Sequence, residues 1–128
     1  MARYSAISRQ LENGRTDCAI NPSLNQIGWY CRNNVPTGTK AVGRKLPSAL
    51  GIYDMSGNAW EWCWDWYEEE YPVGPVKDPV GAAAGVRRVR RGGSWGSITQ
   101  NCRSENREYG EPGEPFYSFG LRLASSAF

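Results

Sequence analysis

The chain has 128 residues, which is enough for one domain and too few for two. Its 15 Gly and 8 Pro predict many turns, and its six Trp indicate that large rings supply much of the core. A net charge of +2 argues against a dedicated nucleic-acid binder, and the absence of histidine excludes Ser-His-Asp hydrolases, His-ligated zinc and His-based acid–base catalysis.

The N-terminal third is predicted to be mostly loop. The first 28 residues are polar, with a helix-compatible stretch only at residues 4–11, and they lack the apolar stretch of a signal peptide. Because no apolar run approaches the ~18 residues that span a bilayer, we expect no membrane insertion. Residues 28–31 predict a short buried strand or bend, and residues 33–45 predict a loop broken by Pro and Gly.

Two strands are predicted in the middle of the chain. The first, over residues 60–67, places four rings on one face that we expect to lie in the core: Trp60, Trp62, Trp64 and Trp66. A surface loop is predicted over residues 68–85. The second strand, within residues 86–95, carries four arginines. We interpret these as covering Trp faces with their stems and pairing with nearby carboxylates, rather than as a phosphate-binding patch.

The C-terminal part is predicted to be a loop followed by a closing strand. Residues 96–119 contain little that predicts regular structure, whereas residues 119–124 alternate apolar and polar side chains. No internal repeat is visible.

The four cysteines lie too far apart for a Cys-x-x-Cys metal or redox pair. The sequence is compatible with two disulfides and equally with four free thiols. If bridges form, Cys18 with Cys31 would close a short polar loop and leave Cys63 with Cys102, although three pairings are possible. We expect Cys102 to be buried or bridged rather than reactive.

Four segments occur in an order that points to a known family: Leu50-Gly51-Ile52-Tyr53-Asp54-Met55-Ser56-Gly57-Asn58-Ala59-Trp60-Glu61-Trp62, Arg91-Gly92-Gly93-Ser94-Trp95, Asn101-Cys102-Arg103-Ser104 and Phe119-Gly120-Leu121-Arg122-Leu123. Together they resemble the formylglycine-generating enzyme (sulfatase-modifying factor) family. The resemblance implies an α+β, loop-rich variant of the C-type lectin fold with low regular secondary structure. Residues 1–128 would form a single domain that matches the C-terminal half of the enzyme domain, or a minimal version of it.

The resemblance also allows a test for catalysis. In the family, copper is held by two thiolates five residues apart, a donor pair that suits Cu(I). The corresponding segment here has one cysteine: one alignment places Ser97 and Cys102 at the two positions, and another displaces Cys102 altogether. The related iron-dependent sulfoxide synthases need three histidines, and this chain has none. We therefore expect no copper, no iron and no catalytic residues.

A structural calcium ion is a further implication of the resemblance. The family's ligand positions match Asp54, Gly57, Ala59 and Glu61, where two carboxylates and two backbone carbonyls would supply oxygens to a hard cation. The alternative interpretation is that Asp54 and Asn58 form side-chain turns onto the backbone while Glu61 meets an arginine.

Between the family's framework residues, the C-terminal segment mixes small, acidic and aromatic residues in the manner of an adaptable binding surface. The predicted ligand-binding residues are Gly96, Ser97, Ile98, Thr99, Gln100, Glu105, Glu108, Tyr109, Glu111, Glu114, Phe116, Tyr117 and Ser118. The arrangement resembles the variable proteins of diversity-generating retroelements, which rewrite such positions. Pro115 and Leu121 depart from the family pattern, in which Arg and Phe are usual.

The predicted function is therefore a non-catalytic domain that presents residues 96–118 to a protein ligand, at a cell surface or on a phage particle rather than in the cytoplasm. The four glutamates of this segment predict basic groups on that ligand. Nucleic acid is not an expected partner, whereas the remainder of a longer parent protein is. The alternative function is a fragment or subunit of a formylglycine-generating enzyme that modifies sulfatase cysteines.

Overall fold

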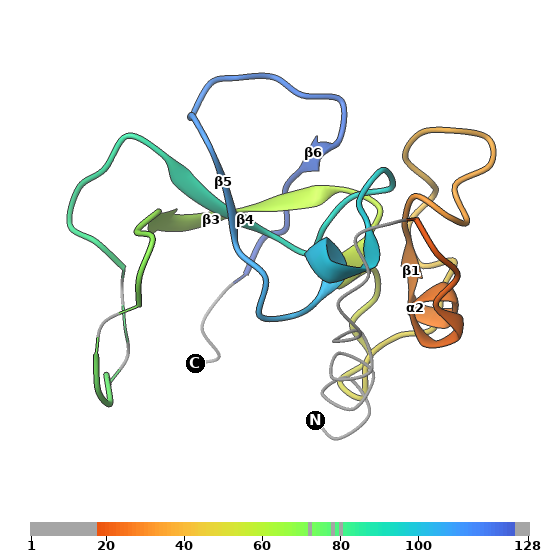
Figure 1. The fold of residues 1–128 in the computed structure, drawn as a ribbon, viewed down its shortest axis with the longest axis horizontal. Helices are drawn as coiled ribbons and strands as arrows, with labels where there is room; N and C mark the ends of the chain where they lie inside the picture. Colours follow the sequence, from red (N-terminus) through yellow and green to blue (C-terminus); the bar gives the residue numbers. More distant parts are fainter. Residues whose placement is uncertain (1–17, 72, 78, 80, 125–128) are drawn as a thin grey trace.

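The computed structural model describes residues 18–71, 73–77, 79 and 81–124 (Figure 1). The elements in chain order are α2 (Pro22–Ile27), β1 (Gly28–Trp29), β2 (Ser56–Gly57), β3 (Trp60–Trp66), β4 (Arg88–Arg91), the 3-10 helix η1 (Thr99–Cys102), β5 (Glu108–Gly110) and β6 (Phe119–Gly120). Short strands joined by long loops agree with the predicted α+β, loop-rich class. The helix predicted over residues 4–11 lies outside the described residues.

The main sheet has four strands in the order β5-β4-β3-β6. β4 runs antiparallel to both β3 and β5, whereas β6 runs parallel to β3 and pairs Phe119 with Trp60. The register between β3 and β4 shifts at an irregularity between Trp62 and Trp66. In Figure 1 the loop from β5 to β6 arches away from the sheet before the chain returns to β3. The two immediate neighbours of β3 in the sheet are therefore β4 and β6, and both are distant from it in sequence.

β1 and β2 form a separate parallel pair. The two backbones approach so closely that a Cβ added at Gly57 would lie 2.0 Å from the carbonyl oxygen of Trp29, and one added at Gly28 would lie 2.1 Å from that of Ser56. Gly57 also has a φ of +79°, a conformation that glycine adopts at no steric cost. Glycine is thus required at both positions for this pairing.

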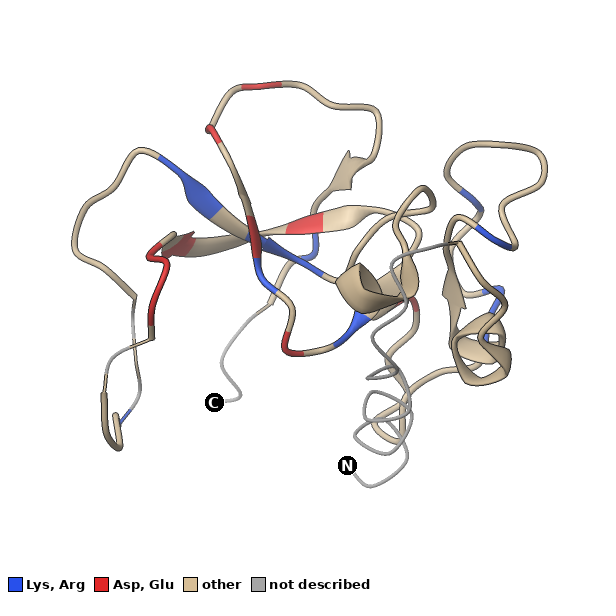
Figure 2. Ribbon diagram, viewed as in Figure 1, with Lys and Arg blue, Asp and Glu red and all other residues tan. Residues whose placement is uncertain are grey.

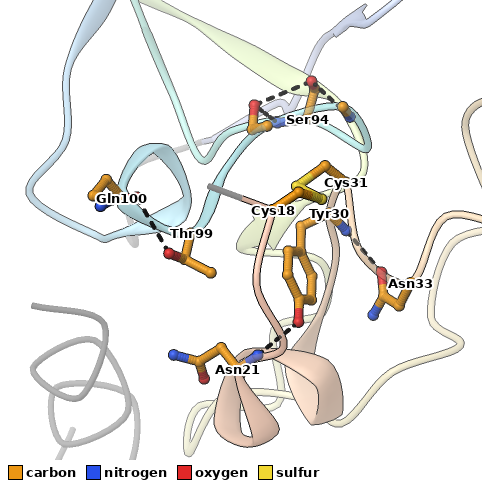
Figure 3. Close-up of a disulfide and its surroundings, with 10 residues drawn as sticks. Cys18, Asn21, Tyr30, Cys31, Asn33, Ser94, Thr99 and Gln100 are labelled. Atoms are coloured by element: carbon orange, nitrogen blue, oxygen red, sulfur yellow. Dashed lines mark hydrogen bonds between the residues drawn. A yellow bond between two sulfur atoms is a disulfide. The ribbon is translucent and has the colours of Figure 1, made fainter. Parts of the chain in front are cut away.

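The core lies where α2 meets η1. α2 begins at Pro22 because the Asn21 side chain caps it, accepting a hydrogen bond of 2.9 Å from the Leu24 N–H. The buried cluster consists of Leu24, Ile27, Tyr30 and Cys102. The Tyr30 hydroxyl accepts from the Asn21 N–H at 2.9 Å, which ties the ring to the start of the helix (Figure 3).

Cys18 and Cys31 form a disulfide, and Cys63 and Cys102 are free thiols (Figure 3). The bridge closes the short loop that was expected, but neither two disulfides nor four free thiols is correct. The predicted second pair is not formed, because Cys102 packs in the core around α2 while Cys63 lies on β3. The expectation that Cys102 is buried or bridged is confirmed by its burial.

Two strand predictions need correction. The Trp-rich strand forms as predicted, but its rings do not all lie in the core: Trp60 is 6% exposed and Trp64 is 83% exposed. Trp64 lies within the irregularity in register, where its ring has the Arg88 guanidinium 4.8 Å from its centre and otherwise faces solvent. The closing strand ends at Gly120, because β6 pairs with β3 through only two residues, and Leu121 and Leu123 are exposed.

Within the described residues, no helix has the length and apolar character needed to cross a bilayer.

Candidate functional site

A groove of about 960 Å³ opens beside the main sheet. Its lining comes from β3, β4, β5 and β6, from the segment before η1, and from the loop between β5 and β6. Many of the predicted binding residues come together here: Gly96, Ser97, Ile98, Glu108, Tyr109, Glu111, Glu114, Phe116, Tyr117 and Ser118. The predicted segment therefore folds around one cavity on a rigid sheet, where loops usually carry recognition.

Three predicted binding residues do not line the groove. Thr99 is buried at the start of η1, and its hydroxyl donates to the Gln100 amide oxygen at 3.3 Å (Figure 3). Glu105 lies beyond η1, where its carboxylate is 3.3 Å from Nε of Arg103. Thr99 and Gln100 belong to η1, whose tight 3-10 turn points successive side chains to different sides, so that Asn101 lines the groove and these two do not.

Several lining residues were not among the predicted ones: Trp60, Arg87, Arg90, Ser94, Trp95, Asn101, Gly110 and Phe119. Most belong to strands or to the Gly-Gly-Ser-Trp turn, which sequence reasoning assigned to the framework or the core. Trp60 and Phe119 reach the groove because they pair with each other across the parallel strands β3 and β6. Local sequence pattern does not specify that long-range register.

Aromatic side chains form one wall of the groove. Phe116 and Tyr117 stack with ring centres 4.4 Å apart, Tyr117 lies 5.6 Å from Trp95, and Phe116 lies 5.2 Å from Phe119. Phe116 is 51% exposed and Tyr117 is 71% exposed. Exposed rings held by other rings offer a large contact area at a low cost in side-chain entropy.

Three serines belong to the lining of the groove. Ser94, Ser97 and Ser118 are buried. The Ser97 hydroxyl oxygen accepts from the Ser94 N–H at 2.9 Å and lies 3.2 Å from the Ser94 hydroxyl (Figure 3). The Ser97 side chain therefore stabilises the turn that begins the binding segment.

Acidic residues occur along β5 and in the loop after it (Figure 2). Glu111 and Glu114 are exposed at the edge of the groove. Glu108 lies opposite Arg90 on the neighbouring strand, with 4.0 Å between Oε2 and Nη2. The predicted acidic surface thus keeps two unpaired carboxylates among the described residues of the groove, and a third lies beside a positive charge.

Three of the four arginines of β4 and its approach, Arg87, Arg88 and Arg90, lie over aromatic rings, as predicted, whereas Arg91 donates to the Tyr71 hydroxyl. Arg88 lies 3.5 Å from the centre of the Trp66 ring and Arg87 lies 4.5 Å from that of Tyr109. The predicted pairing with carboxylates is wrong for most of them. Among the described residues only Arg90 has a carboxylate partner, whereas Arg91 donates to the backbone carbonyl of Ser104 at 3.2 Å. Arg88 likewise donates to a backbone carbonyl, that of Trp64 on β3.

Comparison with known proteins decides the family. Residues 12–127 match the family model described as the sulfatase-modifying factor enzyme 1-like domain. The chain belongs to this family. The formylglycine-generating enzyme of Streptomyces coelicolor is 35% identical over 93 residues, which are 70% of this chain and 30% of that protein.

Two other known proteins are similar to this chain. A protein named serine/threonine-protein kinase Pkn1, from Chlamydia trachomatis serovar L2, is 40% identical over 106 residues, which are 80% of this chain and 17% of that protein. The solved structure of Treponema denticola variable protein 1 superposes with a TM-score of 0.74 at 31% identity, covering 90% of this chain and 43% of that one. The fold and the resemblance expected from the sequence are confirmed. The chain spans less than half the length of each of these relatives.

The copper chemistry associated with the family does not fit the residues of this sulfatase-modifying-factor domain. Cys102 is fully buried, and burial raises the pKa of its thiol to about 12, so the group is protonated at neutral pH. Ser97, at the other position, has a hydroxyl that already takes part in the Ser94 turn. The thiolate pair that Cu(I) needs is therefore missing.

The calcium positions of the family fit in part. Asp54 is buried, and its Oδ2 accepts from the Gly43 N–H at 2.7 Å, while its Oδ1 is buried and has no hydrogen-bond donor in the part of the chain that the structure describes. An unpartnered buried carboxylate oxygen suits a hard cation. Both oxygens of Glu61, however, already accept from the Arg122 guanidinium. Within the described ranges, no three His, Cys, Asp or Glu side chains are grouped closely enough to hold a metal by themselves.

Asn58 has a role that the sequence did not specify. The alternative to calcium placed Asn58 in a local side-chain turn, but its contacts span 18 positions: its Oδ1 accepts from the Lys40 N–H at 2.8 Å, and its Nδ2 donates to the Lys40 carbonyl at 3.1 Å. Its backbone N–H donates to the Trp29 carbonyl, and its carbonyl accepts from the Trp95 N–H. Asn58 therefore connects β1, the loop at Lys40 and Trp95 of the groove lining.

Proposed function

We propose that this domain is a non-catalytic ligand-binding module that presents residues 96–118 to a protein ligand. The observation that carries the proposal is the groove of about 960 Å³, which combines exposed aromatic rings with exposed carboxylates on loops anchored to a sheet. Similarity to a protein named as a variable protein supports a surface open to sequence change. A role in binding also accounts for the misfit between Cys102, Ser97 and a copper site.

Peptide selection tests this proposal directly. A library of random peptides displayed on phage is panned on the immobilised domain. Enriched peptides are then measured against Tyr117→Ser and against Trp64→Ser, a matched change of an exposed ring that does not line the groove. We expect Tyr117→Ser to weaken binding about tenfold or more, because central aromatic side chains dominate binding energy, and Trp64→Ser to leave it unchanged.

Two outcomes would overturn the proposal. Either no peptide is enriched over an unrelated immobilised protein, or the enriched peptides bind both variants equally and so do not use the groove. The enzyme-subunit alternative predicts instead that the domain competes with a chelator for Cu(I), which we do not expect of a chain with one buried thiol in this segment.

The gene's surroundings test whether the surface is diversified. We propose that a near-copy of the coding segment for residues 96–118, with adenines at the variable codons, lies beside a reverse-transcriptase gene. A location at a cell surface or on a phage particle belongs to the same proposal, and the Cys18–Cys31 disulfide supports it because disulfides persist in oxidising compartments. A sulfatase gene in that place would favour the alternative.

We also propose structural calcium at the turn that precedes β3. Asp54 Oδ1 would supply the buried carboxylate oxygen, and the carbonyls of Gly57 and Ala59 with one shared oxygen of Glu61 would complete the protein ligands. Calcium would neutralise the Asp54 carboxylate in its buried position.

A further inference from the structure

Arg90 occupies the floor of the groove at the centre of the main sheet. It lies on β4, between β3 and β5, and its guanidinium carbon is 5.2 Å from the centre of the Trp60 ring and 4.6 Å from that of the Phe119 ring. Both rings also line the groove. The cation is therefore held in place by aromatic faces on neighbouring strands.

The Arg90 guanidinium has no hydrogen-bond acceptor among the described residues, and its Nε is buried without a partner. Its nearest carboxylate oxygen, Oε2 of Glu108, is 4.0 Å from Nη2, which is beyond hydrogen-bond distance. Arg122 is different, since it donates to both oxygens of a carboxylate. Nε is the guanidinium atom that is buried without a partner, and 21% of the Arg90 side chain is exposed, so its other N–H donors remain open to a group that enters the groove.

The surroundings of Arg90 favour an anion that arrives from outside. Burial lowers the pKa of Arg90 from its usual value, so this cation is poorly solvated in the folded chain. A second donor of the groove lining, Nε1 of Trp95, is also buried without an acceptor. Folding has thus already removed part of the water from these donors, so a ligand that binds them has less desolvation free energy to overcome.

We propose that the Arg90 guanidinium anchors a carboxylate group of the ligand at the floor of the groove, between the rings of Trp60 and Phe119. This inference rests on the proposed binding function and adds the chemistry that the floor selects. A carboxylate can accept two parallel hydrogen bonds from one guanidinium. The rings of Trp60 and Phe119 offer the guanidinium no such acceptors. The exposed Glu111 and Glu114 at the edge then face basic groups that flank the carboxylate on the ligand.

Two small probes test the anchor without knowledge of the natural ligand. N-acetyl-phenylalaninate carries an aromatic ring and a carboxylate, and N-acetyl-phenylalaninamide is its neutral counterpart. Both are titrated into the domain and followed by changes in amide chemical shifts. We expect the anion to bind about tenfold tighter than the amide, since a hydrogen-bonded ion pair is worth about that factor or more. N-acetyl-aspartyl-phenylalaninamide distinguishes a side-chain carboxylate from a C-terminal one.

Three variants locate the effect. Arg90→Gln should abolish the preference for the anion, while Arg88→Gln, two positions along the same strand and outside the groove lining, should preserve it. Glu108→Gln keeps Arg90 and removes the one competing carboxylate nearby, so the anion should bind a few-fold tighter. This variant keeps the proposal testable if Arg90→Gln is poorly folded.

The outcomes separate the anchor from the proposed function. Equal binding of the two probes to the unmodified domain, absence of binding by both, or an unchanged anion affinity in Glu108→Gln overturns the anchor. If selected peptides still bind the groove and depend on Tyr117 but not on any carboxylate, the binding function stands and only the anchor fails. If no peptide binds the groove, the proposed function itself fails.

Discussion

Arg122 and Glu61 form a two-fold hydrogen-bonded ion pair, with Nε of the arginine 2.8 Å from Oε2 and Nη2 2.6 Å from Oε1. The pair joins the segment after β6 to β3 over 61 positions in sequence. The same Nη2 lies 3.0 Å from the carbonyl oxygen of Tyr53. One side chain thus connects the segment after β6, the start of β3 and the turn before β2.

Replacing Arg122 should therefore destabilise the fold. We expect Arg122→Gln to lower the free energy of unfolding by about 1–2 kcal/mol, because both partners are partly exposed and a charged hydrogen bond contributes about that much. Arg122→Lys should recover little, since an ammonium cannot make the two-fold contact. Urea unfolding measures both. In the double variant Glu61→Gln/Arg122→Gln the losses should be less than additive, and full additivity would mean that the pair does not couple.

Calcium should raise the stability of the domain through Asp54. We expect the midpoint of thermal unfolding to rise with calcium and to fall back with a chelator, because an ion that binds only the folded chain stabilises it. Asp54→Asn keeps the size of the side chain but removes the charge, so it should abolish the calcium effect. A calcium-independent midpoint in the unmodified domain, with Asp54→Asn equally or more stable, would show that the buried carboxylate has no metal partner.

Asn58 should be costly to replace. Asn58→Ala leaves the Lys40 N–H and carbonyl without partners and places alanine at a φ of 69°, so we expect a loss of about 2–3 kcal/mol in the free energy of unfolding. Asn58→Gly separates the two causes, because glycine accepts this φ but forms neither hydrogen bond. Chemical denaturation of Asn58→Gly should still show most of the loss. A glycine variant as stable as the unmodified domain would assign the cost to backbone conformation alone.

The sequence predicted those features that depend on local pattern. Alternation of Trp with polar residues identified β3, and the Asn-Pro-Ser sequence that caps α2 is an equally local signal. The thirteen-residue disulfide loop was also expected from spacing. Local pattern did not predict which rings of β3 are buried. The surroundings of Trp64 include Arg88, which belongs to a strand more than 20 positions away in sequence.

Local sequence also predicted only part of the candidate site. The loop from β5 to β6 was identified by composition, since exposed rings among small and acidic residues have no helical or strand period. The floor was missed, because Arg90, Trp60 and Phe119 come together only through the strand order β4-β3-β6. In a parallel pair such as β3 with β6, no short turn fixes the register, so the sequence near each residue contains no sign of its partner.

The two free thiols should differ in reactivity. Under denaturing conditions without reductant, we expect a thiol reagent to titrate two groups per chain, since Cys18 and Cys31 are bridged. In the folded domain Cys63, which is partly exposed, should react, and Cys102, which is fully buried, should react slower on the order of 100-fold because it needs local unfolding. Four titrated groups, or none, would contradict the bridge assignment.

The buried thiol of Cys102 should make stability depend on alkaline pH. Its pKa is about 12 in the folded chain and 9.0 in the absence of burial, so the thiol is protonated in both states below pH 9 and its contribution to stability is complete there. Between pH 9 and about 12 the unfolded chain loses this proton first, and the free energy of unfolding should fall by about 1.4 kcal/mol per pH unit.

Cys102→Ala isolates this effect from the titration of Lys and Tyr. The unmodified domain should be the more stable of the two at neutral pH, because alanine leaves a small cavity, and the difference should shrink steadily as the pH rises above 9. Urea unfolding at several pH values measures it. A difference that stays constant would mean that the thiolate is as well accommodated in the folded chain as in water. Cys102 would then be able to serve as a metal-binding thiolate, and the enzyme-subunit alternative would regain its main chemical requirement.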